Sequence, residues 1–243
     1  MIRWELINLI NIRLDDAKAI IIPGPRQSGK TTLLKSLLGS SVEKTLWFNG
    51  DDTDVRQKFE NPSSANIKNY IGDAKVIVFN EAQRIANIGL CIKIITDNFP
   101  GVKVYASGAS AFELANKINE PLTGRKWEFT LFPISFSEMV KHHGLFEEER
   151  ILNHRLVFGY YPDVINSPGN EIDVLKAMSN SYLYKYILTW ERIMNPERLE
   201  ELVQALAFQL GNEVSYHELG KISGLDNKTV EKYLMQLSIS LTR

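Results

Sequence analysis

Residues 20–38, IIIPGPRQSGKTTLLKSLL, decide the fold of this chain because they join three local signals in a fixed order. An apolar run predicts a buried strand, a glycine-bearing turn follows, and leucines at helical spacing predict an amphipathic helix that ends at Gly39. Within the turn, Gly24 to Thr31 matches the pattern G-x-x-x-x-G-K-[ST] at every fixed position. The stretch therefore predicts a strand, a phosphate-binding loop and a helix.

The spacing of this loop has a physical basis in polyphosphate binding. Glycines let the backbone curl so that successive N–H groups face one anion, and the following helix directs the positive end of its dipole at the same point. Lys30 is expected to reach the β and γ phosphates, and the Thr31 hydroxyl to ligate Mg²⁺. Thr32 is expected to pack or cap behind the loop. The predicted nucleotide-binding residues are Gly24, Pro25, Arg26, Gln27, Ser28, Gly29, Lys30, Thr31 and Thr32.

A second apolar run, residues 76–79, ends in the polar pair Asn80-Glu81. An acidic pair in this position commonly holds Mg²⁺ beside a nucleotide, but asparagine keeps only the oxygen and loses the charge. Losing such an outer-shell partner typically lowers metal affinity or activity about 10–100-fold. Glu81 retains a carboxylate that can orient an attacking water, a role generally worth ~10²–10⁴-fold in rate. The pair predicts nucleotide binding with weak Mg²⁺ retention and slow turnover.

Short apolar runs alternate with helical patterns over the first 131 residues, which predicts an α/β fold. Strands separated by helices indicate a parallel sheet with helices on both faces. The expected strands are 19–22, 45–48, 76–79, 102–106 and 127–131. Asp51 and Asp52, after the second strand, could approach a metal, although a turn or a helix N-cap is the favoured interpretation.

After Pro133 the pattern becomes helical, with long helices expected at 171–192 and 196–210. We place a domain boundary near residue 140, which predicts a nucleotide-binding domain at 1–140 and a helical region at 141–243. The acidic run at 147–150 (EEER) is expected to be a solvated helix start.

Residues 213–237, EVSYHELGKISGLDNKTVEKYLMQL, predict a helix-turn-helix. Ser215 with Glu218 forms a capping box, Gly224 supplies the turn, and Asp226 caps the second helix. The next residues, SISLTR (238–243), alternate like the first strand of a wing, which predicts a partial winged helix over about 212–243.

The start of the second of these helices, residues 227–229, would face base edges in a DNA reader. However, residues 215–243 carry four basic and three acidic side chains, which make a weak phosphate-binding surface. DNA recognition and packing or protein contacts therefore both remain open for this region.

Composition limits the cellular setting. The 243 residues carry a net charge of −1, and the single cysteine, Cys91, excludes an internal disulfide and suits a reducing cytoplasm. Its apolar surroundings predict a core position. Residues 1–18 lack the features of a signal peptide and read as an amphipathic helix, and no apolar run is long enough to cross a bilayer.

Other classes of phosphate-loop protein are excluded by missing motifs. Residues 116–119 (NKIN) lack the aspartate of a guanine-reading motif, and no LSGGQ-like transporter signature is present. An additional-strand ATPase remains, in which a polar-ended strand follows the carboxylate strand.

At this point the chain resembles a family: the AAA-type ATPases of bacteria and archaea that carry a C-terminal domain of unknown function. The segments that carry the resemblance are GPRQSGKTTLLKSL (24–37), NEAQRIANIGLCIKIITDNFP (80–100), ASGASAFELANKINEPLTGRKWEFTLFPISFSEM (106–139) and FGYYPDV (158–164). The resemblance implies a P-loop NTPase fold of AAA/RecA-like type, with ATP and Mg²⁺ as cofactors. Members of the family continue past the position of Arg243 through the rest of a wing and a nuclease-like region.

The resemblance also implies roles for single residues. Asn80 and Glu81 take the places of the metal-binding and water-activating acidic pair, and Ser107 or Ser110 takes that of the γ-phosphate-sensing polar residue. Arg125 matches a basic position that could reach a nucleotide in the same or a neighbouring subunit. The second case would require a homo-oligomer. A salt bridge or carbonyl cap is the alternative for Arg125, and Arg26 is similarly ambiguous.

Two functions follow from these features. The first is a cytoplasmic ATPase whose slow hydrolysis moves the helical C-terminal part. The second is a non-hydrolysing ATP-binding module that regulates through DNA or protein contacts.

Overall fold

The computed structural model of this protein describes residues 2–39, 44–108, 118, 121–182 and 196–241. The chain divides into two compact units, Met1–Glu171 and Ile172–Arg243. The domain boundary expected near residue 140 rests on sequence pattern and stays a prediction.

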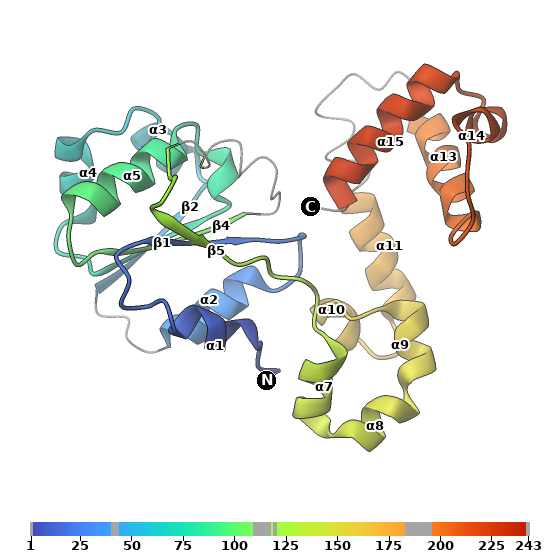
Figure 1. Ribbon diagram of the computed structural model, residues 1–243, viewed down its shortest axis with the longest axis horizontal. Helices are drawn as coiled ribbons and strands as arrows, with labels where there is room; N and C mark the ends of the chain where they lie inside the picture. The colour runs from blue at the N-terminus through green and yellow to red at the C-terminus, as the bar shows by residue number, and fades with distance from the viewer. Residues whose placement is uncertain (1, 40–43, 109–117, 119–120, 183–195, 242–243) are drawn as a thin grey trace. The chain divides into compact units, whose positions relative to one another are not determined.

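A parallel sheet of five strands forms the centre of the first unit (Figure 1). The strand order is β2-β3-β4-β1-β5, and every neighbouring pair is parallel. The strands are β1 (Ala19–Pro23), β2 (Thr45–Asn49), β3 (Val76–Asn80), β4 (Lys103–Gly108) and β5 (Lys126–Glu128). Because β4 lies between β1 and β3, the sheet has the additional strand that the sequence predicted.

Helices cover both faces of this sheet, which confirms the predicted α/β class. Helices α1 (Leu6–Asn11) and α2 (Lys30–Leu38) lie on one face (Figure 1). The other face carries α3 (Thr53–Lys58), α4 (Ser64–Ile71) and α5 (Ile88–Asn98).

Strand β1, which lies between β4 and β5, is buried along its whole length. Its alternate side chains enter the two cores, because successive residues of a strand point to opposite faces. Ile20 and Ile22 pack with Leu33 of α2, whereas Ile21 packs with Cys91 of α5. Cys91 is fully buried, as predicted, and burial raises the pKa of its thiol to about 12.

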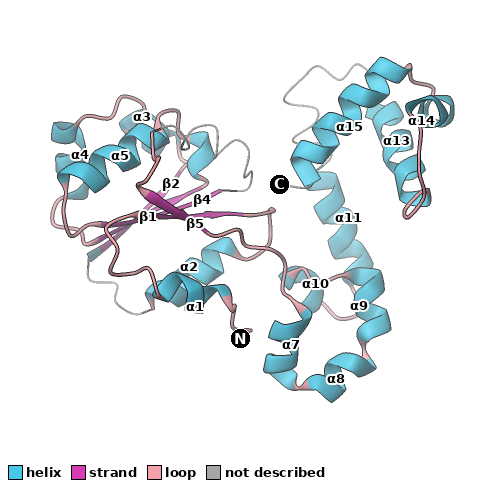
Figure 2. Ribbon diagram, viewed as in Figure 1, coloured by secondary structure: helices cyan, strands magenta, loops and turns pink. Residues whose placement is uncertain are grey.

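Every described element after β5 is a helix (Figure 2). In the first unit these are α7 (Phe136–His143), α8 (Leu145–Arg150), α9 (Leu152–Phe158) and α10 (Pro162–Ile165), and α11 (Glu171–Tyr182) begins at its end. Ser135 and Glu138 form a capping box at the start of α7. The Glu138 carboxylate also accepts the Glu5 N–H at 2.8 Å, which fastens α7 to the N-terminal segment.

The second unit contains α11 from Ile172 onward and three further described helices: α13 (Pro196–Phe208), α14 (Tyr216–Ser223) and α15 (Asn227–Leu241). Leu202, Leu219 and Val230, one from each helix, are fully buried in its core. The Ser215 hydroxyl accepts the Glu218 N–H at 3.1 Å, which is one half of the predicted capping box.

The expected wing strand is wrong, because α15 continues through residues 238–241. A strand at this point has no partner among the described residues, whereas a helix satisfies its N–H and C=O groups within itself. The strand expected at 127–131 is also shorter, since β5 ends at Glu128. Phe129 N–H nevertheless donates to Ile21 at 2.9 Å.

The helix expected at 171–192 is described only as far as Tyr182, and its remainder lies outside the described residues. The helix expected at 196–210 ends at Phe208. No helix in the described ranges is both long enough and apolar enough to cross a membrane.

Candidate nucleotide-binding site

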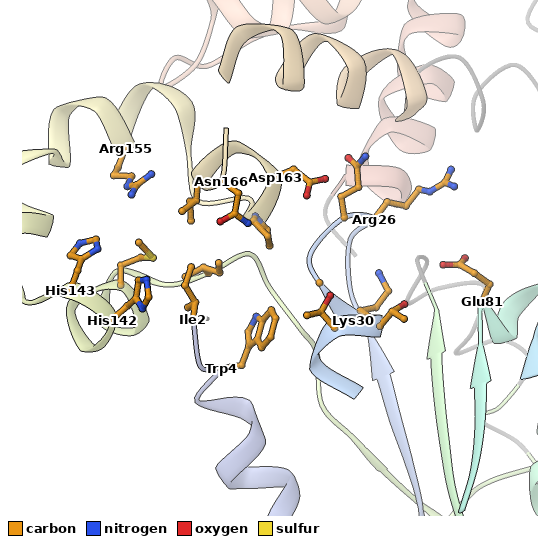
Figure 3. Close-up of a pocket in the computed structure, with 18 residues that line it drawn as sticks. Ile2, Trp4, Arg26, Lys30, Glu81, His142, His143, Arg155, Asp163 and Asn166 are labelled. Atoms are coloured by element: carbon orange, nitrogen blue, oxygen red, sulfur yellow. The ribbon is translucent and has the colours of Figure 1, made fainter. Parts of the chain in front are cut away.

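A cavity of about 810 Å³ lies where β1 and β3 end and α2 begins (Figure 3). In parallel α/β sheets ligands bind beyond the carboxyl ends of the strands, so the position fits a binding site. Its lining on the sheet side is Arg26, Gln27, Gly29, Lys30, Thr31, Thr32 and Glu81. The remaining wall comes from the N-terminal segment and the helices after β5, and all of it belongs to the first unit.

The backbone of residues 24–31 adopts the curl that phosphate binding needs. Gln27 and Gly29 have left-handed φ angles of 59° and 93°. Gly29 is the N-cap of α2 and makes no side-chain cap, so no capping side chain occupies the first N–H groups of this helix, the groups that bind anions at helix N-termini. Gly24 is required for packing, because a Cβ there would lie 2.2 Å from the Leu131 carbonyl oxygen.

The Lys30 ammonium is buried at the base of the loop. It donates to the Gly24 and Pro25 carbonyls at 2.9 and 2.6 Å. Burial lowers its pKa to about 8, with Glu81 opposing this shift and Arg26 adding to it. An arriving phosphate would replace the two carbonyl acceptors with oxygens that carry full charge.

Asn80 joins three elements of the site. Its Oδ1 accepts the Ser107 hydroxyl at 2.9 Å and the Thr31 hydroxyl at 3.3 Å. Thr31 is the second residue of α2, Asn80 ends β3, and the fully buried Ser107 lies in β4. The structure thus brings together the two residues predicted for Mg²⁺ and the residue predicted to sense the γ phosphate.

Glu81 follows Asn80 and lines the same cavity as Lys30 (Figure 3). Its backbone is left-handed, with φ 49° and ψ 41°. Gln83 Nε2 donates to its Oε2 at 2.8 Å. Gly50 packs directly against the backbone of Glu81, since a Cβ at position 50 would lie 2.3 Å from the Glu81 carbonyl oxygen.

Arg125 is not part of this cavity. It directly precedes β5, and its carbonyl accepts the Ala19 N–H, so it lies at the amino end of the sheet, opposite the loop. Its Nε pairs with Asp97 at 2.7 Å. Arg125 thus lies away from the cavity of its own chain and makes the salt bridge considered as the alternative, whereas a role toward a nucleotide in a neighbouring subunit stays a prediction.

The other predicted residues differ in whether they line the cavity. Arg26 lines the cavity, and Thr32 is exposed there rather than packed behind the loop. Ser110 lies outside the described residues. Asp51 pairs with Arg84 at 2.9 Å, and Asp52 is the N-cap residue of α3, which agrees with the favoured turn and cap interpretation.

Trp4 is a cavity residue that the sequence did not reveal. It is 5% exposed and packs directly on the loop, because a Cβ at Gly29 would lie 2.7 Å from Trp4 Cζ2. Its indole N–H has no hydrogen-bond partner among the described residues. The pattern of residues 1–18 predicted an amphipathic helix but carried no signal for a contact between Trp4 and the loop.

Arg155 is a second such residue, held by a buried carboxylate. Glu148, fully buried in α8, accepts Tyr160 Oη at 2.7 Å and pairs with His143 Nε2 at 2.8 Å. Arg155 Nε lies 3.5 Å from the same carboxylate, which is an ion pair rather than a hydrogen bond. Burial, followed by the bond to Glu148, raises the pKa of Tyr160 to about 12. The expectation of a solvated helix start is thus wrong at Glu148, because α7, α9 and the loop after α9 each supply a partner for its buried carboxylate.

These contacts bring His143 and Arg155 to the wall across from the loop (Figure 3). The cavity therefore has cations on two sides, Lys30 and Arg155, with the Glu81 carboxylate near the first. Such an arrangement can hold a polyanion and place one carboxylate beside it.

Comparison with known proteins agrees with this geometry. The family model described as AAA domain matches residues 16–140, and a domain of unknown function (DUF8612) matches residues 149–241. No curated protein matches the chain significantly.

Several solved structures are similar. The Walker-type ATPase of Pyrococcus abyssi is 14% identical with a TM-score of 0.64, covering 99% of this chain and 90% of its own. The Holliday junction branch migration motor RuvB of Thermotoga maritima is 13% identical with a TM-score of 0.43, covering 98% and 88%. The ORC2 protein of Aeropyrum pernix, in its ADP form, is 16% identical with a TM-score of 0.43, covering 96% and 83%.

At 14% identity the Pyrococcus structure shows the fold alone, and the two lower scores carry no argument. The family match covers more than half of the chain. With its phosphate loop and its additional-strand sheet, the chain belongs to the AAA family of P-loop ATPase domains, and a domain of unknown function follows.

Proposed function

We propose that this protein binds ATP with Mg²⁺ and hydrolyses it slowly, because Asn80 stands where a carboxylate would hold the metal. The observation that carries the proposal is the meeting of Thr31, Asn80 and Ser107 beside Lys30 and Glu81. The hydroxyl and amide oxygens in this set are the hard ligands that Mg²⁺ prefers, so the residues fit the ion.

Different residues of the site are assigned to phosphate binding, metal binding and activation of water. The loop N–H groups and Lys30 would hold the phosphates, while the Thr31 hydroxyl and the Asn80 amide oxygen would hold the metal and its hydration shell. Glu81 orients the attacking water and accepts its proton. When bound, Mg²⁺ would neutralise charge on the β and γ phosphate oxygens. Arg155 lies on the wall across from the loop, where the Glu148 carboxylate offsets its positive charge.

The direct test measures ATP affinity and turnover with Mg²⁺ for the parent and for Lys30→Ala and Glu81→Gln. We expect Lys30→Ala to abolish measurable binding, and Glu81→Gln to bind normally but lose turnover by ~10²–10⁴-fold. If Lys30→Ala binds ATP as tightly as the parent, the assignment of the loop is wrong.

A second candidate is a nucleotide-binding regulator that does not hydrolyse ATP. The uncharged Asn80 amide, already accepting two hydroxyl protons, favours it. Tight ATP binding without turnover in the parent, together with turnover in Asn80→Asp, would select this candidate over the first.

We further infer that α14 and α15 form a helix-turn-helix. In support, Gly224 takes a left-handed φ of 64° between them, and Asp226 Oδ1 accepts the N–H groups of Lys228 and Thr229, both at 3.0 Å. Lys228 is exposed at the start of α15. Duplex DNA binding by the parent and by Lys228→Glu separates the uses: equal affinities would leave protein contacts as the role of this region.

A cytoplasmic location and self-association complete the proposal. The buried thiol of the single cysteine supports the first. Sedimentation with and without ATP tests the second, and a monomer in both conditions would remove it.

A further inference from the structure

The carboxylate of Glu81 is held by a buried side chain two residues further along the chain. We propose that Gln83 is a positioning residue, which fixes the Glu81 carboxylate so that its other oxygen faces the water beside the nucleotide. This inference rests on the proposed function of the site.

The hydrogen bond itself supports this role. Gln83 is only 4% exposed, and its Nε2 donates to Glu81 Oε2 at 2.8 Å. Glu81 Oε1 has no hydrogen-bond partner among the described residues, while the side chain lines the cavity with Lys30. One carboxylate oxygen is thus committed to the protein and the other is available to a water.

Main-chain hydrogen bonds hold the backbone at Glu81, so its side-chain torsions are the main remaining degrees of freedom. The Gly50 N–H donates to the Asn80 carbonyl at 2.8 Å, and the Arg84 N–H donates to the Glu81 carbonyl at 3.0 Å. A left-handed conformation at a residue other than glycine persists only where its surroundings over-determine it. With the main chain clamped, the Glu81 torsions decide where the carboxylate lies, and the bond from Gln83 restricts them.

A neutral donor is suited to this task. An arginine or lysine here would pair with the carboxylate and weaken it as a base, whereas an amide orients it without neutralising it. Gln83 is too deeply buried to meet the nucleotide itself, and it is not among the residues that line the cavity. Its effect must therefore pass through Glu81.

The test compares Gln83→Met, which keeps length but loses the donor, with Gln83→Glu, which keeps shape but adds a charge. Gln57→Met, at an exposed position on α3, is the matched control. We expect Gln83→Met to lower kcat about tenfold while KM and the affinity for a non-hydrolysable ATP analogue stay within about twofold. Gln83→Glu should move the acid limb of the kcat profile to higher pH, because two adjacent carboxylates resist ionising together.

A double-mutant cycle with Glu81→Ala separates positioning from general packing. Gln83→Met should have no further effect on kcat, or on affinity for ADP with aluminium fluoride, once the carboxylate is gone. An undiminished effect in the Glu81→Ala background, or an equal loss of analogue affinity in Gln83→Met, would overturn the proposal. Thermal unfolding of both Gln83 variants checks that they fold.

Failure of the proposed function gives a different result. If the analogue binds but neither the parent nor Asn80→Asp turns over, hydrolysis is absent. The aluminium fluoride affinities then still decide whether Gln83 acts through Glu81.

Discussion

Two side chains, Asn80 and Lys30, distinguish this site from a phosphate-loop site that carries two adjacent carboxylates at the end of β3. The Asn80 amide oxygen collects two hydroxyl protons, which keeps the geometry of the pair without its charge. The Lys30 ammonium is bonded to its own loop and is buried enough for its pKa to fall. Both features bear directly on the metal and on the phosphates, and each leads to a measurement.

Restoring the carboxylate in Asn80→Asp should strengthen the hold on Mg²⁺. We expect turnover to reach half its maximum at a Mg²⁺ concentration about 10–100-fold lower than in the parent, because an anion again organises the hydration shell. Asn49→Asp, at the end of the neighbouring strand, controls for adding a charge nearby. Unchanged Mg²⁺ dependence in Asn80→Asp would contradict this account of Asn80.

The lowered pKa of Lys30 gives nucleotide affinity a pH dependence of definite sign. Below pH 8 the amine is protonated and attracts phosphate; as the pH rises through about 8 the free protein loses this charge. Affinity for ATP should therefore fall above pH 8, by up to about tenfold per pH unit. Lys30→Arg should show no such fall, since a guanidinium stays charged. A flat profile in the parent would refute the prediction.

Helix α7 shows how one element builds the far wall of the cavity. Ser135 and Glu138 cap its first turn, and the Glu138 carboxylate reaches back to the Glu5 N–H. Met139 and His142 of the same helix then line the cavity. A local cap is thereby coupled to the long-range packing of the N-terminal segment.

Removing this cap should lower stability measurably. Ser135→Ala should reduce the free energy of unfolding by about 0.5–2 kcal/mol, because the α7 N–H groups lose their acceptor. Ser36→Ala, at an exposed position inside α2, should leave stability unchanged or slightly higher. Chemical denaturation monitored by circular dichroism compares them, and equal stabilities would show that the cap contributes nothing.

Two compact units make up the chain, and the cavity belongs to one of them. Every residue that lines it lies between Ile2 and Asn166, inside the first unit. The second unit has its own core between α13, α14 and α15. Nucleotide binding and whatever the second unit contacts are therefore separable by experiment.

A fragment of residues 1–171 should bind an ATP analogue within about threefold of the full chain, because it contains the complete cavity. Calorimetric titration of both proteins is the measurement, with Lys30→Ala in the fragment as the control. A loss of more than about tenfold in a folded fragment would show that the second unit contributes to the site.

Local sequence patterns were enough to predict much of the fold and part of the candidate site. Each of the five described strands overlaps an expected run, although β5 does so only at Trp127 and Glu128. The run is clearest at β1, because a strand buried on both faces is a continuous apolar segment. The loop and the Asn80-Glu81 pair were found for the same reason: their chemistry lies in adjacent residues. The wing strand failed because alternation in SISL cannot report whether a partner strand exists.

What the sequence by itself determined is the strand, loop and helix around Lys30, and the loss of one charge at Asn80, since both are properties of neighbouring residues. Only the tertiary structure placed Arg125 at the amino end of the sheet, away from the loop, and brought Trp4 and Arg155 to the cavity, with Arg155 beside the buried Glu148. The physical reason is that burial and ion pairing depend on which elements meet in space, and no local spacing records that meeting.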